Sequence, residues 1–341
     1  MTTQVNQACP VCGNIGGNRR HEAREMMFGF RDRFEYIECS ACGTLSICQP
    51  PEDLGKYYPA QYYSFRPLKG FYHFVKCRQA RHSFGANDLL GFMIALFLGP
   101  EGSVAALKHL QPDLGSRILD VGSGSGAFLH FLAQSGFKHL WGIDPFLPEA
   151  QIQGEGYVVK KSRLAEVREK FDIITLNHVF EHLDDPLMTL QEIARHLSAD
   201  GVAVIRIPVA DSFAWRKFGV NWVQLDCPRH LFLHTRKGLA LLAGKAGLEI
   251  SDVVYDSTSF QFWGSCLYQE DVALTSKSSL LNNRWKLIVQ LPRLFLFSRQ
   301  AKRLNHLGEG DSACFYLVRR DYQGPGNSVA TLARTGEIGG A

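Results

Sequence analysis

The stretch "ILDVGSGSGAFLHF", residues 118–131, decides the fold, because an aliphatic run breaks into three glycines and then resumes as an apolar, helix-like segment. A strand, a glycine-rich turn and a helix in this order form a nucleotide-binding unit. Gly122, Gly124 and Ala127 fit the G-x-G-x-x-G/A spacing of dinucleotide sites, whereas Gly122, Gly124 and Gly126 fit a D-x-G-x-G-x-G turn. The turn alone therefore leaves the bound nucleotide open.

Strand-like and helix-like runs alternate on the carboxyl side of this stretch. The strand-like runs are "RILDVG", "HLWGID", "YVVKK", "KFDIITLN" and "GVAVIRIP", followed by a further helix and strand and by the late run "ACFYLVRR" from Ala313. Such alternation predicts an α/β fold: a Rossmann-like, mostly parallel sheet of seven strands with helices on both faces.

Composition limits the classes of protein and partner. The 341 residues are 45% hydrophobic and 21% charged, which suits an α/β core with a small additional module. A net charge of +4 is too weak to indicate a nucleic-acid partner. The polar start "TTQVNQA" predicts no secretory signal and thus a cytoplasmic protein. Because a spanning helix needs about 20 apolar residues, the ten-residue run "LLGFMIALFL" predicts a buried helix and no transmembrane segment.

Four of the nine cysteines form two C-x-x-C pairs near the amino terminus. The pairs are Cys9 with Cys12 in "CPVCGN" and Cys39 with Cys42 in "CSACGT". Four thiolates in two such knuckles provide the tetrahedral ligand set of a structural zinc ion, and a glycine follows each pair where the knuckle turns. The sequence therefore predicts a zinc-ribbon-like module, while the five scattered cysteines are expected to be small buried hydrophobic residues.

Two acidic residues flank the glycine turn. Asp120 ends the first strand, where a dinucleotide enzyme usually has an apolar residue, and Asp144 ends the next strand, twenty residues after Gly124. An acid at the second position takes the ribose hydroxyls in both nucleotide classes. Only Asp120 therefore favours a methyl donor over a dinucleotide.

Residues 170–208, "KFDIITLNHVFEHLDDPLMTLQEIARHLSADGVAVIRIP", resemble the fourth strand, helix and fifth strand of class I S-adenosylmethionine-dependent methyltransferases. With the zinc knuckles, "YYPAQYY" and "QLDCPRHLFLHT", the chain is similar to methyltransferases of bacterial polysaccharide and secondary-metabolite pathways. The resemblance implies binding of S-adenosylmethionine by a set that comprises Asp120, Gly122, Ser123, Gly124, Gly126, Asp144, Pro145, Ser162, Asn177 and His178. In this set the glycines and Ser123 approach the methionine part, Asp144 the ribose, Ser162 the adenine, and Asn177 with His178 the sulfonium.

The resemblance also divides the chain. It implies a zinc-ribbon-like module over residues 1–48, a linker with connecting helices over 49–112, and a methyltransferase domain over 113–320. The domain is expected to contain an insertion at about 257–311, and residues 321–341 are expected to be a disordered tail. The basic and apolar stretch near 283–304 predicts a lid helix, with a peripheral membrane contact as the alternative.

Methyl transfer to a hydroxyl needs a base, and two loops offer candidates. "NHVFEHL" places His178, Glu181 and His182 after a strand, and in quinone O-methyltransferases the matching motif E-x-x-E-H can hold magnesium. Because His178 replaces the first glutamate, the sequence leaves open whether this loop binds a metal. Helix capping and loop packing by Glu181 and His182 are an equal alternative.

The second loop, "NWVQLDCPRHLFLHT", crowds polar and aromatic side chains after the fifth strand. We predict that its His230 is the general base, with His182 as the rival. The structural alternatives are that Arg229 pairs with a surface acid and that His234 caps the helix beginning near Thr235.

These patterns predict methyl transfer from S-adenosylmethionine to a small-molecule, glycan or lipid-linked acceptor, at a hydroxyl oxygen. An RNA guanine methyltransferase is one alternative, and a non-enzymatic zinc-ribbon interaction protein with a relic cofactor fold is another. "NHVF" stands where base-methylating enzymes have an N-P-P-Y-type loop, which speaks against nucleic acid, and the intact Asp120 and Asp144 speak against a relic.

Overall fold

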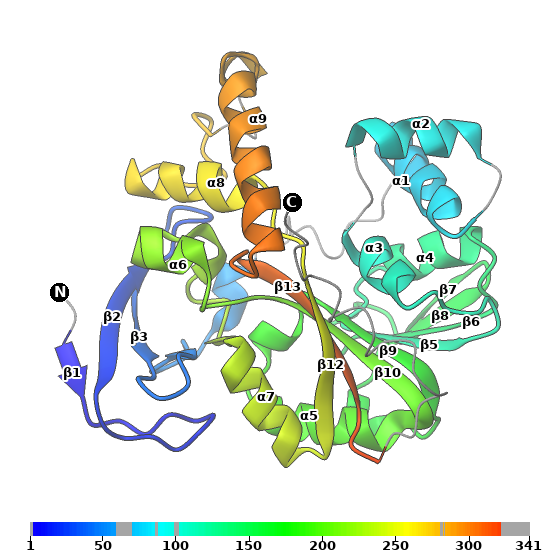
Figure 1. Ribbon diagram of the computed structural model, residues 1–341, viewed down its shortest axis with the longest axis horizontal. Coiled ribbons are helices and arrows are strands. Elements are labelled where there is room, and N and C mark those ends of the chain that lie inside the picture. Colours follow the sequence, from blue (N-terminus) through cyan, green and yellow to red (C-terminus); the bar gives the residue numbers. More distant parts are fainter. Residues whose placement is uncertain are drawn as a thin grey trace, which may run out of the picture.

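Eight strands form the central sheet of the computed structural model, in the order β12-β13-β10-β9-β5-β6-β8-β7 (Figure 1). The structure describes residues 3–58, 70–85, 88–98, 102–279, 282 and 284–321. In chain order the strands are β5 (Arg117–Val121), β6 (His139–Ile143), β7 (Gln151–Gly154), β8 (Tyr157–Lys160), β9 (Phe171–Asn177), β10 (Leu197–Pro208), β12 (Leu248–Tyr255) and β13 (Ser312–Arg319). β13 runs antiparallel to both of its neighbours and β7 antiparallel to β8, while the others are parallel. The α/β fold is thus confirmed.

The expected count of seven strands is wrong by one. The additional strand is β7, which forms a hairpin with β8 at the sheet edge. Gly156 has φ +80° in the turn of this hairpin, a left-handed conformation that glycine adopts without a steric cost. The polar sequence "QIQGEG" lacks the alternation of a half-buried strand, so this edge strand was not predicted.

Adjacent residues of the central strands point into two different cores. Ile118, Ile173 and Val204 pack on one face, together with α4 (Ala127–Gln134) and α3 (Gly102–His109). Leu119 and Ile174 pack on the other face with α5 (Pro186–His196) and α7 (Arg236–Lys245). Figure 1 shows these helix pairs on opposite sides of the sheet. Burial on both faces explains why these strands are almost continuously apolar.

The amino-terminal module is an antiparallel sheet that takes one strand from elsewhere in the chain. Its own strands are β1 (Thr3–Val5), β2 (Asn18–Arg24), β3 (Arg33–Glu38) and β4 (Leu45–Ile47). β11 (Phe232–Leu233) pairs with β4, so the order is β1-β2-β3-β4-β11. A strand of the predicted loop 221–235 therefore joins the module to the main domain.

The remaining helical elements precede the central sheet or lie between its strands. They are η1 (Leu54–Tyr57), α1 (Gly70–Ser83), α2 (Leu89–Leu98), η3 (Leu164–Glu166), η4 (Phe180–His182), α6 (Phe213–Phe218), η5 (Gly219–Asn221), η6 (Val223–Leu225), α8 (Phe260–Gln269) and α9 (Arg284–His306). The three helices α1 to α3 lie in the range expected to hold connecting helices. The expectation that α2 is buried is wrong for its described side chains, since Leu89 is 78% exposed and Phe92 46% exposed. Residues 322–341, most of the tail expected to be disordered, lie outside the described residues.

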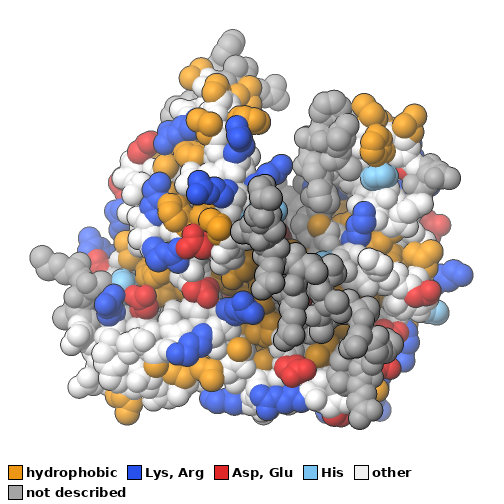
Figure 2. Space-filling view, viewed as in Figure 1, with side chains coloured by type: hydrophobic (Ala, Val, Ile, Leu, Met, Phe, Trp, Pro, Cys, Tyr) orange, Lys and Arg blue, Asp and Glu red, His pale blue; other side chains and the backbone are white. Residues whose placement is uncertain are grey.

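The predicted insertion is built mainly of α8 and α9. Ala301 and Leu304 near the end of α9 are buried, whereas its Phe295 and Leu296 are more than half exposed. Figure 1 shows α9 projecting from the body of the molecule, and Figure 2 shows hydrophobic side chains at the outer ends of the projections that α9 and α2 form. Closure of α9 over an acceptor and contact of α9 with a membrane both stay predictions. Among the described helices, none is long and apolar enough to cross a membrane.

Candidate functional site

The glycine turn lies against the end of β9. Gly122, Gly124 and Gly126 have φ values of +69°, +52° and +78°, which side chains other than glycine rarely adopt. A Cβ atom on Gly122 would lie 2.5 Å from Cγ2 of Val179. Glycine is therefore required both for the turn and for its close approach to the loop that follows β9.

Asp144 organises the turn through both carboxylate oxygens. Oδ2 accepts a hydrogen bond from the Gly124 amide (3.0 Å) and Oδ1 accepts one from the Phe146 amide (2.8 Å). The hydroxyl of Ser123 is buried and has no hydrogen-bond partner among the described residues. Phe146 is 79% exposed, so an aromatic face lies free next to this acid. Ser162 follows β8 and donates a hydrogen bond to Glu166 (2.9 Å).

Asp120 ties the turn to β9. Its Oδ1 accepts hydrogen bonds from the Thr175 hydroxyl (2.7 Å) and the Asn177 amide (3.4 Å). Burial raises the pKa of Asp120 to about 7, against the lowering effect of these two hydrogen bonds. The carboxyl ends of β5, β6 and β9 therefore place the predicted cofactor-binding residues along one edge of the sheet.

A buried glutamate lies among three histidines next to this edge. Glu181 in η4 is fully buried, and its Oε1 lies 3.2 Å from Nδ1 of His178. Nε2 of His178 contacts the guanidinium of Arg206, which also pairs with Asp256. A guanidinium only donates, so His178 accepts there and its Nδ1 carries the hydrogen directed at Glu181. His178 has φ +54°, an uncommon conformation for a residue with a side chain.

His182 and His230 come from different loops and meet edge to face, with ring centroids 4.7 Å apart. Nδ1 of His182 lies 2.9 Å from the Arg229 carbonyl oxygen, and Nδ1 of His230 lies 2.8 Å from the Gln224 carbonyl oxygen. His182 is half-buried, while His230 is only 6% exposed. Together with Glu181 they form a cluster whose ligand atoms all lie within 4.8 Å of one another. The structure thus brings together the three residues predicted for catalysis.

Burial and neighbouring charges shift the pKa values of this cluster in a consistent direction. Burial lowers the pKa of His230 to about 4, helped by the adjacent His182, so its ring is neutral near pH 7. Burial alone would raise the pKa of Glu181, but the hydrogen bond from His178 and the surrounding histidines hold it at about 2. The cluster thus combines the carboxylate of Glu181 with the neutral imidazole of His230.

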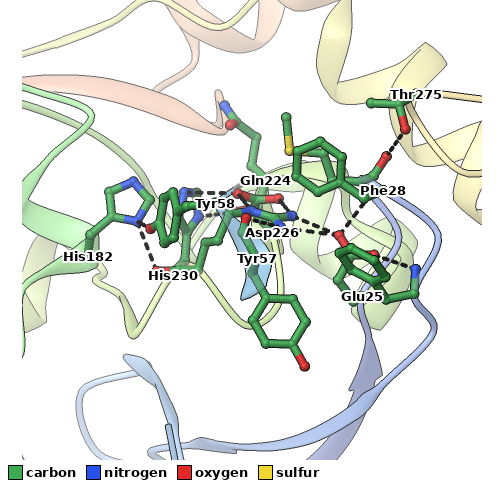
Figure 3. A network of polar contacts seen from close by, with 12 residues as sticks. Glu25, Phe28, Tyr57, Tyr58, His182, Gln224, Asp226, His230 and Thr275 are labelled. Atoms are coloured by element: carbon green, nitrogen blue, oxygen red, sulfur yellow. Dashed lines mark hydrogen bonds and ion pairs between the residues drawn. The ribbon is translucent and has the colours of Figure 1, made fainter. Parts of the chain in front are cut away.

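Arg229 joins the amino-terminal module to this cluster. Its guanidinium, fully buried, lies 2.6 Å from Oδ1 of Asp226 and 3.2 Å from Oε1 of Glu25 at the end of β2. Figure 3 shows His182, Tyr58 and His230 at one end of this network and Glu25 at the other. The interpretation of Arg229 as a partner of a surface acid is wrong, because its partner Glu25 is fully buried. The sequence does not show that Glu25, which follows β2, lies next to this loop.

Sequence reasoning missed Glu25 and the position of Tyr58. Glu25 carries no motif, and its role follows only from contacts with residues some two hundred positions away. Tyr58 belongs to "YYPAQYY", whose aromatic residues are a signal that could have found it. Its hydroxyl lies 3.1 Å from Nδ1 of His182, and the described part of this linker therefore borders the cluster.

The capping interpretations of Glu181, His182 and His234 are wrong. Asp185 caps α5, where its side chain accepts a hydrogen bond from the Met188 amide, and Thr235 caps α7. His234 is fully buried and stacks on Phe232, with its ring nitrogens unpaired among the described residues. Asp185 and Thr235 satisfy the free amides at the starts of α5 and α7, so Glu181, His182 and His234 do not cap these helices.

The four cysteines of the two knuckles converge on one point. Sγ of Cys9 lies 3.7 Å from that of Cys42, and Sγ of Cys12 lies 3.5 Å from that of Cys39. Four sulfurs about 2.3 Å from a zinc ion in a tetrahedron lie about 3.8 Å apart, so the cluster fits that metal. Of the other cysteines, Cys227 and Cys314 are buried as expected, whereas the remaining three are half-buried.

The cysteine cluster packs directly on the main domain. The Thr235 hydroxyl donates a hydrogen bond to the Cys42 carbonyl (2.5 Å), and Lys237 and Lys245 of α7 donate to the Ala41 and Val11 carbonyls. The cysteines belong to the same apolar cluster as α7. Two ammonium groups beside the knuckles also oppose the net charge of about −2 that zinc with four thiolates carries.

A cavity of about 560 Å³ lies at the opposite edge of the sheet, outside this candidate site. Lys170, Ser198, Asp200 and Arg319 line it near the amino ends of β9 and β10. Ligands of such sheets bind at the carboxyl ends of the strands, so we assign this cavity no role.

Residues 97–253 match the family model described as a methyltransferase domain. This match spans the glycine turn and the strands from β5 to β10 of the central sheet, in which β13 runs antiparallel beside β10.

Two curated relatives match parts of the chain. The ubiquinone biosynthesis O-methyltransferase of Azorhizobium caulinodans is 27% identical over 162 residues, which are 43% of this chain and 64% of that protein. The EEF1A lysine methyltransferase 2 of Homo sapiens is 40% identical over 65 residues, which are 19% of this chain and 26% of that protein. The matches thus span less than two thirds of either relative.

Among solved structures, the chain is similar to magnesium protoporphyrin IX methyltransferase from Synechocystis PCC 6803 with bound S-adenosylhomocysteine. The TM-score is 0.36 at 17% identity, and the match covers 57% of this chain and 84% of the other.

Proposed function

We propose that this protein transfers a methyl group from S-adenosylmethionine to a hydroxyl oxygen of a small-molecule or glycan-type acceptor. One observation carries the proposal: the glycine turn, the acids of β5 and β6, and the histidine cluster after β9 share one edge of a methyltransferase domain. In-line displacement at a sulfonium requires donor and acceptor to be aligned there. The name of the Azorhizobium relative, an O-methyltransferase, supports oxygen as the acceptor atom.

The cofactor would lie along this edge. Gly122, Ser123, Gly124 and Gly126 would face the methionine part, and Asn177 with His178 the sulfonium. Asp144 and Pro145 would contact the ribose, because the Asp144 carboxylate retains lone pairs beyond its two amide contacts. The adenine would lie near Ser162, and the exposed ring of Phe146 offers it a stacking face.

The cluster of Glu181, His182 and His230 would activate the acceptor hydroxyl. His182 is the more accessible histidine and has Tyr58 beside it, so the acceptor would meet His182 before His230. The four-cysteine cluster would hold one structural zinc ion. Because that ion needs reduced thiolates, we place the protein in the cytoplasm.

Cofactor choice is tested by calorimetry with S-adenosylhomocysteine and with NAD. The protein should bind the former and not the latter. Asp144→Ala should weaken binding about tenfold to a hundredfold, because hydrogen bonds to a charged group contribute about 1.5–3 kcal/mol. Glu149→Ala, an exposed acid five residues further on, is the matched control. Tight NAD binding would contradict the proposal.

The acceptor is tested by transfer of labelled methyl from S-adenosylmethionine into a fractionated lysate. Label should enter the small-molecule or glycan fraction. Label in RNA would favour the RNA alternative, and an absence of transfer in every fraction by a protein that binds the cofactor would favour the non-enzymatic alternative.

A further inference from the structure

We infer that Glu181, His182 and His230 bind a divalent metal ion of the zinc type, and that the acceptor hydroxyl completes its coordination. The three side chains offer one carboxylate oxygen and two imidazole nitrogens, all within 4.8 Å of one another. Metal binding does not depend on the proposed methyl transfer, whereas the catalytic role of the metal rests on it.

The hydrogen bonds of both imidazoles leave the same nitrogen available. Nδ1 of His182 faces the Arg229 carbonyl at 2.9 Å and Nδ1 of His230 faces the Gln224 carbonyl at 2.8 Å. A carbonyl oxygen only accepts, so each Nδ1 carries a hydrogen and Nε2 is the ring nitrogen that would bind a metal. This bond from Nδ1–H to a backbone carbonyl is the usual support of a metal-binding histidine.

Glu181 also offers a carboxylate oxygen that lacks a partner in the described part of the chain. The residue is fully buried, and its Oε2 has no hydrogen-bond partner among the described residues. Leaving a buried polar atom unpaired costs about 1–3 kcal/mol, more for a charged group. A cation bound by this carboxylate, whose Oε1 lies 3.9 Å from Nε2 of His230, would compensate its unpaired charge.

Charge balance also favours a divalent cation. Glu25, Asp226 and Glu181 are buried carboxylates, or nearly so, and among the described residues the guanidinium of Arg229 pairs with only the first two. Three negative charges against one positive charge leave a local excess of about two. Buried charge of this size is costly unless it is paired with a cation or coordinates a metal.

The ligand set favours zinc over magnesium. Zinc readily takes two histidines with one glutamate and keeps a further position open, whereas magnesium prefers oxygen ligands. The set also differs from E-x-x-E-H, since His178 is turned between Arg206 and Glu181 and cannot ligate. His230, from the loop before β11, takes the third place instead.

In the proposed reaction the acceptor hydroxyl would occupy the open position. A metal ion held by Glu181, His182 and His230 would lower the pKa of the acceptor hydroxyl, so that its proton could pass to water as the oxygen attacks. This oxygen forms a bond to the methyl carbon while the carbon–sulfur bond breaks with its electron pair on sulfur. The products are the methyl ether and S-adenosylhomocysteine.

Zinc content per chain is the decisive measurement. The wild-type protein, loaded with Zn²⁺ and dialysed, should hold two zinc ions, one at the cysteines and one here. Glu181→Gln, of nearly the same shape, should hold one. His234→Phe is the matched control, because it replaces another buried histidine and should keep both ions. If Glu181→Gln does not fold, His182→Gln at a half-buried position gives the same measurement.

Three results would overturn the inference: one zinc in the wild type, two in both cluster variants, or displacement of the second ion by millimolar Mg²⁺. Binding of S-adenosylhomocysteine, measured on the same samples, tests the proposed function separately. A wild type with two zinc ions and no cofactor binding would keep the metal site and reject the methyl transfer. A wild type with one zinc ion and normal cofactor binding would reject the second metal site and leave the proposed methyl transfer standing.

Discussion

The four-cysteine cluster and the cluster of Glu181, His182 and His230 differ in how the chain brings their members together. The two cysteines of each pair are only three residues apart, and the glycine after each pair donates an amide hydrogen bond to the carbonyl of the first cysteine (2.8 Å in both knuckles). The second cluster takes members from two loops about fifty residues apart, with no fixed spacing. The comparison shows that a site formed within local turns has a sequence motif with fixed spacing. A site whose members come from distant loops has no such spacing in the sequence.

The two clusters should also differ in what their loss does, and the cysteine cluster should show the largest effect. Cys42→Ser should unfold the whole protein, because the knuckles share an apolar core with α7. Structural zinc contributes about 10–16 kcal/mol in small domains, comparable with the total stability of a domain. Thermal melting followed by circular dichroism checks this, with the half-buried Cys48→Ser as control. An unchanged melting temperature would show that the module does not need its metal.

The second cluster should instead govern turnover. His182→Gln and His230→Gln should each lower the rate about a hundredfold to ten-thousandfold while the affinity for S-adenosylhomocysteine stays near wild type. Equal losses would fit two ligands of one metal. A loss confined to one variant would identify that histidine as a direct base, and if it is His182 the prediction for His230 is wrong. His139→Gln, exposed at the other edge of the sheet, is the control.

Arg229 connects the amino-terminal module to the loop that carries His230, so its replacement should lower the free energy of unfolding. Arg229→Met leaves Glu25 and Asp226 without their guanidinium, and breaking such a buried pair costs about 3–5 kcal/mol. Arg20→Met is the control, because the pair of Arg20 with Glu35 is exposed and contributes at most about 1 kcal/mol. Denaturant unfolding measures both. Similar losses in the two variants would mean that the buried network does not hold the module in place.

The smallest expected effect is a pH dependence from His234, a buried histidine outside both clusters. Burial lowers its pKa to about 4, below the value of about 6.5 in an unfolded chain. The unfolded state therefore binds more protons between these values, and stability is lost as the pH falls from about 6.5 toward 4. His234→Phe should reduce the loss between pH 7 and pH 5 by about 2 kcal/mol, measured by denaturant unfolding at both values. Parallel curves for the two proteins would contradict this account.

Much of the fold was predictable because strand and helix periods are local. The strands β5 and β9 and the second part of β10, residues 201–208, stand out as apolar runs, since both of their faces are buried. The edge strand β7 lacks that burial and carried no signal. The pairing of β11 with the amino-terminal sheet was not predictable either, because a strand of two residues is too short to show an alternation of apolar and polar residues.

The candidate site divides in the same way. The glycine turn, Asp144 and the C-x-x-C pairs were predictable, since each depends on backbone geometry within a few residues or on a fixed strand–turn–helix unit. Glu25 and Arg229 were misjudged or missed, because their pairing spans 204 positions. His234 was misassigned because Thr235 at the next position caps α7 instead.

The sequence by itself determined the mostly parallel α/β sheet, the glycine turn after its first strand, and the thiolate set of the knuckles. Only the tertiary structure decided that Glu181 and His182 meet His230, that Arg229 neutralises an acid from β2, and that the knuckles rest on α7. The physical reason is that local conformation follows from side-chain sterics and period, whereas buried charges acquire partners only when distant segments pack together.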